Sequence, residues 1–303
     1  MTRIAVFGEM LLDQFASGPV VGGAPFNVAR HLAAFGHAPL MVSAVGTDAH
    51  AQTVLAEMDR YAMDRAGVQV TPDHATGLVD VAMQANGSHQ FSIRSNSAWD
   101  FIDTRRALAA TAALEPTGYL YAGSLALRSA VSRATGLALM QSHAGPVYLD
   151  LNWREGHVTQ EIALQAIGLA DTLKVNDDEF LMLCQWLGIA ATEGLPQHNN
   201  VRQLLRQLPL NLLLVTCGSE GALAFDGEGR CIAQGSNTRA IQLVDTVGAG
   251  DAFSAVVLAG LLRAWDMETT LQRANTFSGH ICETRGAVPV ELAAYHQWTA
   301  DWQ

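Results

Sequence analysis

The sequence is poor in charged residues and in cysteine, and its charge balance is acidic. Only 16% of its 303 residues are charged, and 18 Lys and Arg face 29 Asp and Glu, for a formal net charge of -11. No basic run offsets this charge, so we expect neither nucleic acid nor an acidic membrane as a partner. Cys184, Cys217, Cys231 and Cys282 form no Cys-x-x-Cys pair, which favours free thiols in a reducing compartment.

Several common segments and motifs are missing. The apolar N-terminal run resembles a strand and has no signal-peptide cleavage site, and no apolar run reaches the length of a membrane span. We therefore expect a cytoplasmic protein. The nucleotide loop GxxxxGK[ST] is absent, and no GxGxxG follows the first apolar run, which argues against a nicotinamide-dependent oxidoreductase.

What the sequence does contain is a regular alternation of strand-like and helix-like segments. Hydrophobic residues make up 49% of the chain, a globular composition. Short apolar runs predict strands at 3–8, 39–46, 118–123, 146–152, 172–176 and 211–218, and helical patterns include 24–36 and 48–63. The alternation predicts an α/β fold with a doubly wound, mostly parallel sheet and helices on both faces.

One region has the pattern of a hairpin. Residues 77–95 alternate with period two around Asn86-Gly87, which predicts two antiparallel strands, and residues 11–21 could supply another short strand. We expect a small antiparallel sheet beside the main domain, formed by insertions at about 11–22 and 76–99. It is either a lid over a substrate cleft or an ordinary edge hairpin.

A glycine turn and an acid precede a helix-like run near the C-terminus. Gly248, Ala249 and Gly250 come directly before Asp251. Backbone N–H groups at a helix start lack partners and attract anions, and glycine lets an anion approach closely. Asp251 could accept a proton from a hydroxyl beside that anion. The alternative is structural, because Asp is a favoured cap and glycine is common before helices.

Two longer strings extend this motif. DTVGAGDAF at 245–253 and GGAPFNVA at 22–29 resemble the two signatures of the ribokinase-like, phosphofructokinase-B-type carbohydrate kinases. They stand more than 200 residues apart in the family's order. The resemblance implies one ribokinase-like catalytic domain over 1–303 with a β lid. It also implies transfer of the γ-phosphoryl group of ATP to a hydroxymethyl group of a sugar or nucleoside.

The resemblance assigns roles around the transferred group. Asp251 becomes the general base and the turn 248–250 an anion hole. Asp245 and the backbone of Val247 fall near a monovalent-cation site, so K⁺ is a possible cofactor. Asn176 and Glu179 match the family's Asn-x-x-Glu, which helps to organise Mg²⁺ and phosphate, although the same residues suit an ordinary helix start.

The resemblance also implies a nucleotide side of the site. The string VTCGSEGA at 215–222 resembles the strand and turn along which the nucleotide lies. Thr216, Gly218 and Gly221 are the positions that match. Asn275 falls where the family often has a polar residue near the adenine, although an Asn on a helix is usually only solvated.

The sugar side starts from GEMLLD at 8–13, which resembles the fructokinase branch. Asp13 matches the family's substrate-binding acid, and Gly22, Gly23 and Asn27 complete that side. Carboxylates and amides suit this task because they accept and donate hydrogen bonds to hydroxyl groups. Standing alone, Asp13 would equally suit a turn after a strand.

Four more residues are candidates for the pocket wall. Asn152 and Arg154 match the family's D-x-N-x-R stretch, but Leu151 replaces a proline and the usual aromatic pair after the Arg is missing. Arg94 either reaches the sugar or phosphate from the lid or faces solvent. Trp99 either caps a sugar ring or packs the lid against the core.

Together these features predict a fructokinase whose ligands are a sugar, ATP and Mg²⁺, with a homodimer through the lid as a further possibility. The alternatives are a 2-keto-3-deoxygluconate kinase, a ribokinase or nucleoside kinase, and a non-catalytic sugar- or nucleotide-binding protein on the kinase fold. The last is disfavoured because the acid and the glycine turn are both present.

Overall fold

The computed structural model describes residues 4–83, 89–112, 118–236 and 241–302. Strand β1 (Ile4–Phe7) shows why the main sheet is covered on both faces. Ile4 and Val6 point into one hydrophobic core, and Ala5 and Phe7 point into the other. Because successive strand residues face opposite sides, an uninterrupted apolar run indicates a strand that is buried on both faces.

The main sheet confirms the predicted architecture. Its order is β13 (Cys231–Gly235), β12 (Ala222–Asp226), β11 (Leu212–Thr216), β10 (Thr172–Asn176), β9 (Val147–Asp150), β8 (Tyr119–Gly123), β1, β4 (Pro39–Val45) and β5 (Val68–Val70). The strands from β11 to β5 are parallel. Strands β12 and β13 continue the sheet antiparallel, an addition that the sequence analysis did not predict.

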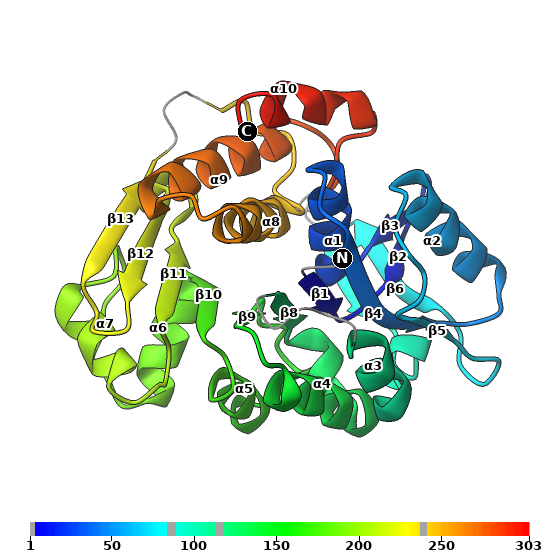
Figure 1. Cartoon of the computed structure of the whole chain (residues 1–303), viewed down its shortest axis with the longest axis horizontal. Helices are drawn as coiled ribbons and strands as arrows, with labels where there is room; N and C mark the ends of the chain where they lie inside the picture. The colour runs from blue at the N-terminus through cyan, green and yellow to red at the C-terminus, as the bar shows by residue number, and fades with distance from the viewer. Residues whose placement is uncertain (1–3, 84–88, 113–117, 237–240, 303) are drawn as a thin grey trace.

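Helices cover both faces of this sheet (Figure 1). One face carries α1 (Ala24–Ala34), α2 (Ala49–Arg60), α8 (Ala249–Leu262) and α9 (Met267–Cys282). The other carries α3 (Thr104–Thr111), α4 (Ala130–Ser142), α5 (Gln160–Ile167), α6 (Asp177–Trp186) and α7 (His198–Leu205). The short α10 (His296–Thr299) follows, and Trp302 beyond it packs into the same core as α1 and α9.

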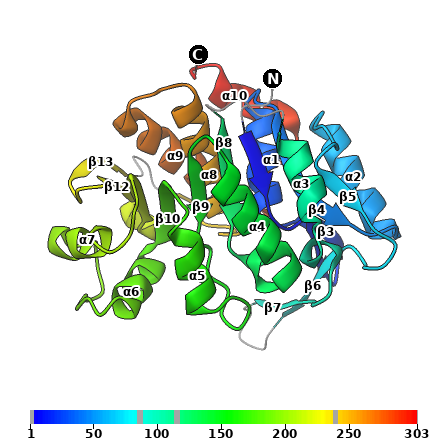
Figure 2. The same cartoon turned by 60° about the horizontal axis from the view of Figure 1, so that its bottom comes forward.

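A second sheet lies beside the main one (Figure 2), and we call it the small sheet. It consists of β3 (Gly18–Gly22), β2 (Leu11–Phe15), β6 (Gly77–Met83) and β7 (His89–Ile93), in that order. The predicted hairpin is present as β6 and β7, whereas its Asn86-Gly87 turn lies outside the described residues.

The small sheet differs from the prediction in two ways. Residues 11–22 form two antiparallel strands rather than one, and β2 pairs with β6 in parallel. The parallel pairing follows from the connections. Strands β2 and β6 come directly after β1 and β5, which point the same way in the main sheet, so both enter the small sheet in the same direction.

Two expectations about the whole chain can be compared with the described residues. All four cysteines are free, as predicted. No helix in the described part of the chain is both long enough and apolar enough to cross a membrane.

Candidate active site

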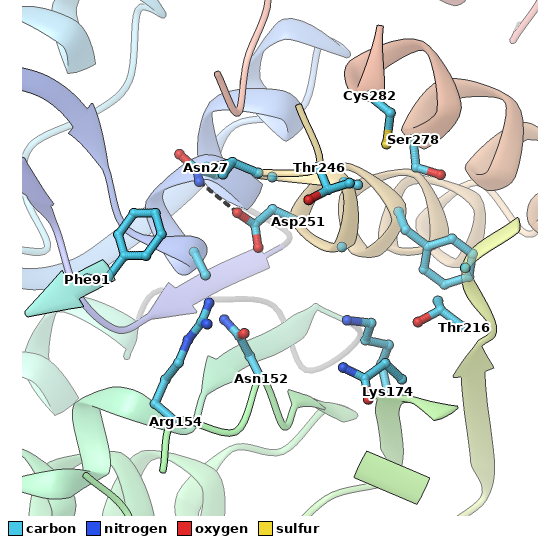
Figure 3. A pocket seen from close by; sticks show the side chains of 18 of the residues that line it. Asn27, Phe91, Asn152, Arg154, Lys174, Thr216, Thr246, Asp251, Ser278 and Cys282 are labelled. Atoms are coloured by element: carbon cyan, nitrogen blue, oxygen red, sulfur yellow. Dashed lines mark hydrogen bonds between the residues drawn. The ribbon is translucent and has the colours of Figure 1, made fainter. Parts of the chain in front are cut away.

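A cleft opens above the carboxyl ends of the parallel strands (Figure 3). The direction in which successive strands are added reverses here, because β4 and β5 lie on one side of β1 and β8 lies on the other. Such a switch point is where open α/β sheets bind ligands. Many of the predicted residues line the cleft: Asp13, Gly23, Asn27, Asn152, Arg154, Asn176, Thr216, Gly218, Gly221, Val247, Gly248, Ala249, Gly250, Asp251 and Asn275.

The glycine turn forms the start of α8. Gly248 caps the helix in the left-handed region at φ 80°, where a Cβ would come within 2.4 Å of Ala287. Only glycine combines that backbone conformation with so close a neighbour. The amide of Ala249 donates to the Thr246 carbonyl at 3.3 Å. The start of α8 and the positive end of its dipole therefore stand at the cleft, an arrangement suited to an anion.

Asp251 lies in this first turn and is 9% exposed. Its Oδ2 accepts a hydrogen bond of 2.6 Å from Asn27 Nδ2, and Asn27 Oδ1 in turn accepts from Arg30. Arg30 also donates to Glu57 at 3.1 Å, so a chain of polar contacts fixes the carboxyl. Burial raises the pKa of Asp251 to about 6, although the Asn27 hydrogen bond opposes the rise. A carboxylate with this affinity for a proton suits a general base near neutral pH.

Lys174 on β10 is a cleft residue that the sequence analysis missed. It is the only lysine of the chain. Its Nζ donates to Asp150 Oδ1 at 3.1 Å, and Ser254 donates to the other oxygen of Asp150 at 2.8 Å. A Cβ on Gly250 would lie 3.1 Å from Lys174 Nζ, so the amine stands beside the glycine turn.

The charge of Lys174 survives its burial. Burial lowers the pKa of Lys174, but the Asp150 and Glu179 carboxylates outweigh that effect, so the pKa lies above its ordinary value. A buried ammonium group therefore lies next to the start of α8, where an anion would bind. The scarcity of lysine was the signal that could have drawn attention to this residue.

Asn176 and Glu179 form a capping box at the start of α6. Asn176 Oδ1 accepts from the amide of Glu179, and the Glu179 carboxylate accepts from the amides of Asn176 at 2.9 Å and Trp153 at 2.6 Å. Glu179 is buried and does not line the cleft, whereas Asn176 and Asp177 do. Glu179 thus holds together the two loops that follow β9 and β10.

The side-chain oxygens near the start of α6 suit a hard cation that keeps most of its ligands from phosphate and water. Asn176 and Asp177 are the side chains that face the cleft there. The described residues contain no cluster of three or more His, Cys, Asp or Glu that could hold a metal alone. A cation at this place would therefore depend on oxygens of a bound nucleotide.

Asp245 connects two loops rather than lining the cleft. One carboxylate oxygen accepts from the amide of Val247 at 3.0 Å and the other from the amide of Gly286 at 3.1 Å. Val247 lines the cleft. Asp245 therefore fixes the loop that leads into the glycine turn.

Asp13, on β2, also lines the cleft. Burial raises the pKa of Asp13 to about 6, and Arg154 and Arg30 oppose the rise. Gly22 lies so close to Asp13 that a Cβ on Gly22 would be 2.5 Å from Asp13 Oδ2. Gly23, at φ 105°, packs against the carbonyl of Glu9, another cleft residue that the sequence analysis missed.

Like Gly22, Glu179 and Asp245, the predicted residues Arg94 and Trp99 do not line the cleft. Arg94 binds Asp80 with hydrogen bonds of 2.8 and 2.7 Å, and its side chain is 56% exposed. Trp99 is fully buried, and the guanidinium of Arg128 lies 4.0 Å from its ring centre. Of the alternatives stated above, the structure has the exposed arginine and the packing tryptophan, because Asp80 supplies a local partner and the core encloses the indole.

The nucleotide-side candidates come from β11 and α9. Gly221 has a φ of 91°, and a Cβ on it would meet the Gly235 carbonyl at 2.1 Å. Asn275 is buried rather than solvated, and its amide donates to the Leu271 carbonyl at 2.9 Å. Between these elements the cleft is lined by Ile241, Leu243, Ser278, Gly279 and Cys282, a largely apolar set that the sequence analysis did not identify.

The comparisons with known proteins agree with this geometry. The family model described as pfkB family carbohydrate kinase matches residues 4–292. The curated fructokinase-2 of Oryza sativa subsp. japonica is 28% identical, with 94% of this chain and 90% of that protein covered.

Solved structures show the same fold. A fructokinase with bound ATP from Xylella fastidiosa superposes with a TM-score of 0.83 at 23% identity, covering 99% of this chain and all of that one. A fructokinase double mutant from Vibrio cholerae O395, solved with fructose, ADP and potassium ion, gives 0.78 at 24% identity, covering 99% and 98%. With a family model matched over nearly its whole length, the chain belongs to the pfkB family of carbohydrate kinases.

Proposed function

We propose that this carbohydrate kinase is a fructokinase, which transfers the γ-phosphoryl group of ATP to a hydroxymethyl group of fructose. The observation that carries the proposal is the position of Asp251. It is a buried carboxyl at the start of α8, in a cleft that also contains a buried ammonium group, Lys174. A base and an anion-binding surface side by side are what transfer from a phosphate to a hydroxyl requires.

The reaction then divides among the residues as follows. Asp251 accepts the proton of the acceptor hydroxyl as its oxygen attacks the γ-phosphorus, and the bond from that phosphorus to ADP breaks. The amides of the turn 248–250 and the ammonium of Lys174 stabilise the charge on the moving group. Magnesium, when bound with the nucleotide, would neutralise phosphate charge from a position near Asn176 and Asp177.

The charge of the acceptor end supports a neutral sugar. Asp13 and Asp251 line this end, against the single guanidinium of Arg154. Excess carboxyl groups oppose a phosphorylated or acidic substrate and suit hydroxyl groups, with Asn27 and Asn152 as further hydrogen-bonding partners. The curated fructokinase relatives favour fructose among the neutral sugars.

The remaining expectations belong to the same proposal. The chain acts as one catalytic domain in the cytoplasm, and the small sheet serves as a lid that keeps water from the phosphoryl group. Potassium would sit near the loop that Asp245 holds. Val20 is exposed on the small sheet, and a second copy of the chain could cover it, whereas Phe91 lines the cleft.

A panel of acceptors tests the proposal. Purified protein with ATP, Mg²⁺ and K⁺ would be offered fructose, 2-keto-3-deoxygluconate, ribose or adenosine, one at a time, and ADP release measured. We expect turnover with fructose well above that with the others. Preference for another acceptor would overturn the sugar assignment and keep the reaction. No ADP release with any acceptor, together with heat on titration of ATP, would favour a binding protein.

A further inference from the structure

Glu9 is a cleft residue to which the mechanism above gives no role. It follows β1, is 3% exposed and lines the cleft together with Asp251. Its Oε2 atom is completely buried and has no hydrogen-bond partner among the described residues. An ionised carboxylate is costly in such a place, so the surroundings favour the neutral, protonated form.

Burial outweighs the groups that stabilise the charge of Glu9. The backbone amides of Glu9 and Ala24 and the guanidinium of Arg154 favour ionisation, whereas Asp251 opposes it. The hydroxyl of Tyr121, from β8, also lies within electrostatic range and is buried without a partner among the described residues.

The other buried cations near the cleft are already paired. Arg30 binds Glu57 and Asn27, and Lys174 binds Asp150. Arg154 is exposed and lies within electrostatic range of Glu9, Asp13 and Asp251 alike. The described residues therefore hold too little positive charge near Glu9 and Asp251 to balance both carboxylates.

The two carboxyls are not equivalent. Burial raises the pKa of Glu9 to about 7 and that of Asp251 to about 6. Asp251 accepts a hydrogen bond from the Asn27 amide, whereas Glu9 accepts from backbone amides but leaves its buried Oε2 without a donor. Neighbouring carboxyls titrate as a pair, and the first proton leaves the better-solvated member. Here that member is Asp251, which is 9% exposed against 3% for Glu9.

We propose that Glu9 is a positioning residue that keeps a proton beside Asp251, so that the pair carries a single negative charge when the acceptor hydroxyl meets the phosphoryl group. The proposal rests on the proposed function, in which Asp251 is the base. Asp251 takes up the hydroxyl proton and later releases it to solvent, while Glu9 keeps its own. Ionised Glu9 would add a second negative charge facing the anionic phosphoryl group and oppose its approach.

The pH dependence of turnover tests this pairing. Wild type, Glu9→Gln and the control Asp226→Asn would be compared for kcat and KM of the sugar from about pH 5 to about pH 9. Glutamine is neutral at every pH and so imitates protonated Glu9. Asp226, on β12, is paired with Arg230 at the surface and does not line the cleft, so it controls for the exchange of a carboxyl for an amide.

For wild type we expect kcat to rise through about pH 6, as Asp251 ionises, and to fall above about pH 7, as Glu9 ionises. In Glu9→Gln the fall should disappear. Near pH 9 the variant should keep a fraction of its maximal kcat that is roughly tenfold larger than the fraction wild type keeps. Asp226→Asn should match wild type. A Glu9→Gln profile that keeps the alkaline fall, or is lowered equally at every pH, would overturn the proposal.

A second measurement needs neither activity nor a stable Glu9 variant. The carbon-13 chemical shifts of the glutamate carboxyls would be measured against pH in wild type and in Asp251→Asn, to give the titration midpoint of each glutamate. We expect one glutamate to titrate near pH 7 and to move to lower pH in Asp251→Asn, while Glu179, whose raised pKa has other causes, stays in place. If no midpoint moves, the pairing is wrong, whatever the acceptor panel shows; if it moves and no sugar is phosphorylated, the proposed function fails instead.

Discussion

At the scale of single residues, the chain places its only lysine beneath the glycine turn. Lys174 is 6% exposed, and Asp150, 1% exposed, is its only ion-pair partner in the described residues. A buried pair of this kind adds little net stability, but removal of one partner leaves a charge without compensation. The pair therefore makes sense as a means of keeping an ammonium group at an anion site.

This pairing predicts the effect of Asp150→Asn. We expect the free energy of unfolding to fall by about 3 kcal/mol, because the Lys174 charge is left buried without its carboxylate. The pKa of Lys174 should fall from its raised value. In protein grown with isotope-labelled lysine, a single side chain gives the signal, so its titration can be read without assignment.

A matched control comes from an exposed pair. Asp226→Asn breaks the contact with Arg230, which is largely solvent-exposed, so we expect a much smaller loss of stability. If Asp150→Asn costs no more than Asp226→Asn and leaves the titration of Lys174 unchanged, the ion pair does not hold the ammonium group.

At the scale of elements, the start of α8 depends on what packs behind it. Gly248 contacts Ala287, whose carbonyl accepts a hydrogen bond from His31 Nε2 at 3.1 Å. Tyr295 in turn donates from its hydroxyl to His31 Nδ1 at 2.8 Å, so α1 and the C-terminal segment fix the neighbour of the turn. The two glycines of the turn consequently differ in what a side chain would meet.

Gly248→Ala and Gly250→Ala should have different effects. At Gly248 an alanine would be strained by the left-handed backbone conformation, and its methyl group would clash with Ala287. We therefore expect a loss of about 2 kcal/mol or more in the free energy of unfolding. At Gly250 the methyl meets only the flexible end of Lys174, at 3.1 Å, inside a helix. Stability should be kept there, while the methyl crowds the anion site and lowers kcat. Denaturant unfolding and turnover, measured on both variants, check this; equal losses of stability would contradict it.

Elements also show how far the sequence could predict the fold. Six strands of the main sheet follow from short apolar runs, because burial on both faces demands such runs: β1, β4, β8, β9, β10 and β11. Strand β5, which is only three residues long, was not predicted. Strand β13 is less visible, since exposed and buried residues share it. The direction of β2 relative to β6 depends on the direction of the main-sheet strand that precedes each of them, and periodicity within a strand contains no such information.

At the scale of the whole molecule, the site assembles residues that the sequence separates widely. Asn27 and Asp251 are 224 positions apart and share a hydrogen bond. Their motifs indicated a common site through family resemblance, but Glu9 and Lys174 belonged to neither motif. Arg94 and Trp99 show the opposite error, since the sequence predicted them in the site and they do not line it. The direction in which each side chain points depends on local partners such as Asp80 and Arg128.

The central claim, that Asp251 is the base in transfer of phosphate from ATP to fructose, is tested most directly by comparing wild type with Asp251→Asn in one assay. The amide keeps the shape of the carboxyl but cannot accept the hydroxyl proton. We predict phosphorylation of fructose by wild type and a kcat lowered by roughly 10³ in the variant, with binding of fructose and ATP retained in calorimetry. A variant that phosphorylates fructose at close to the wild-type rate would contradict the account.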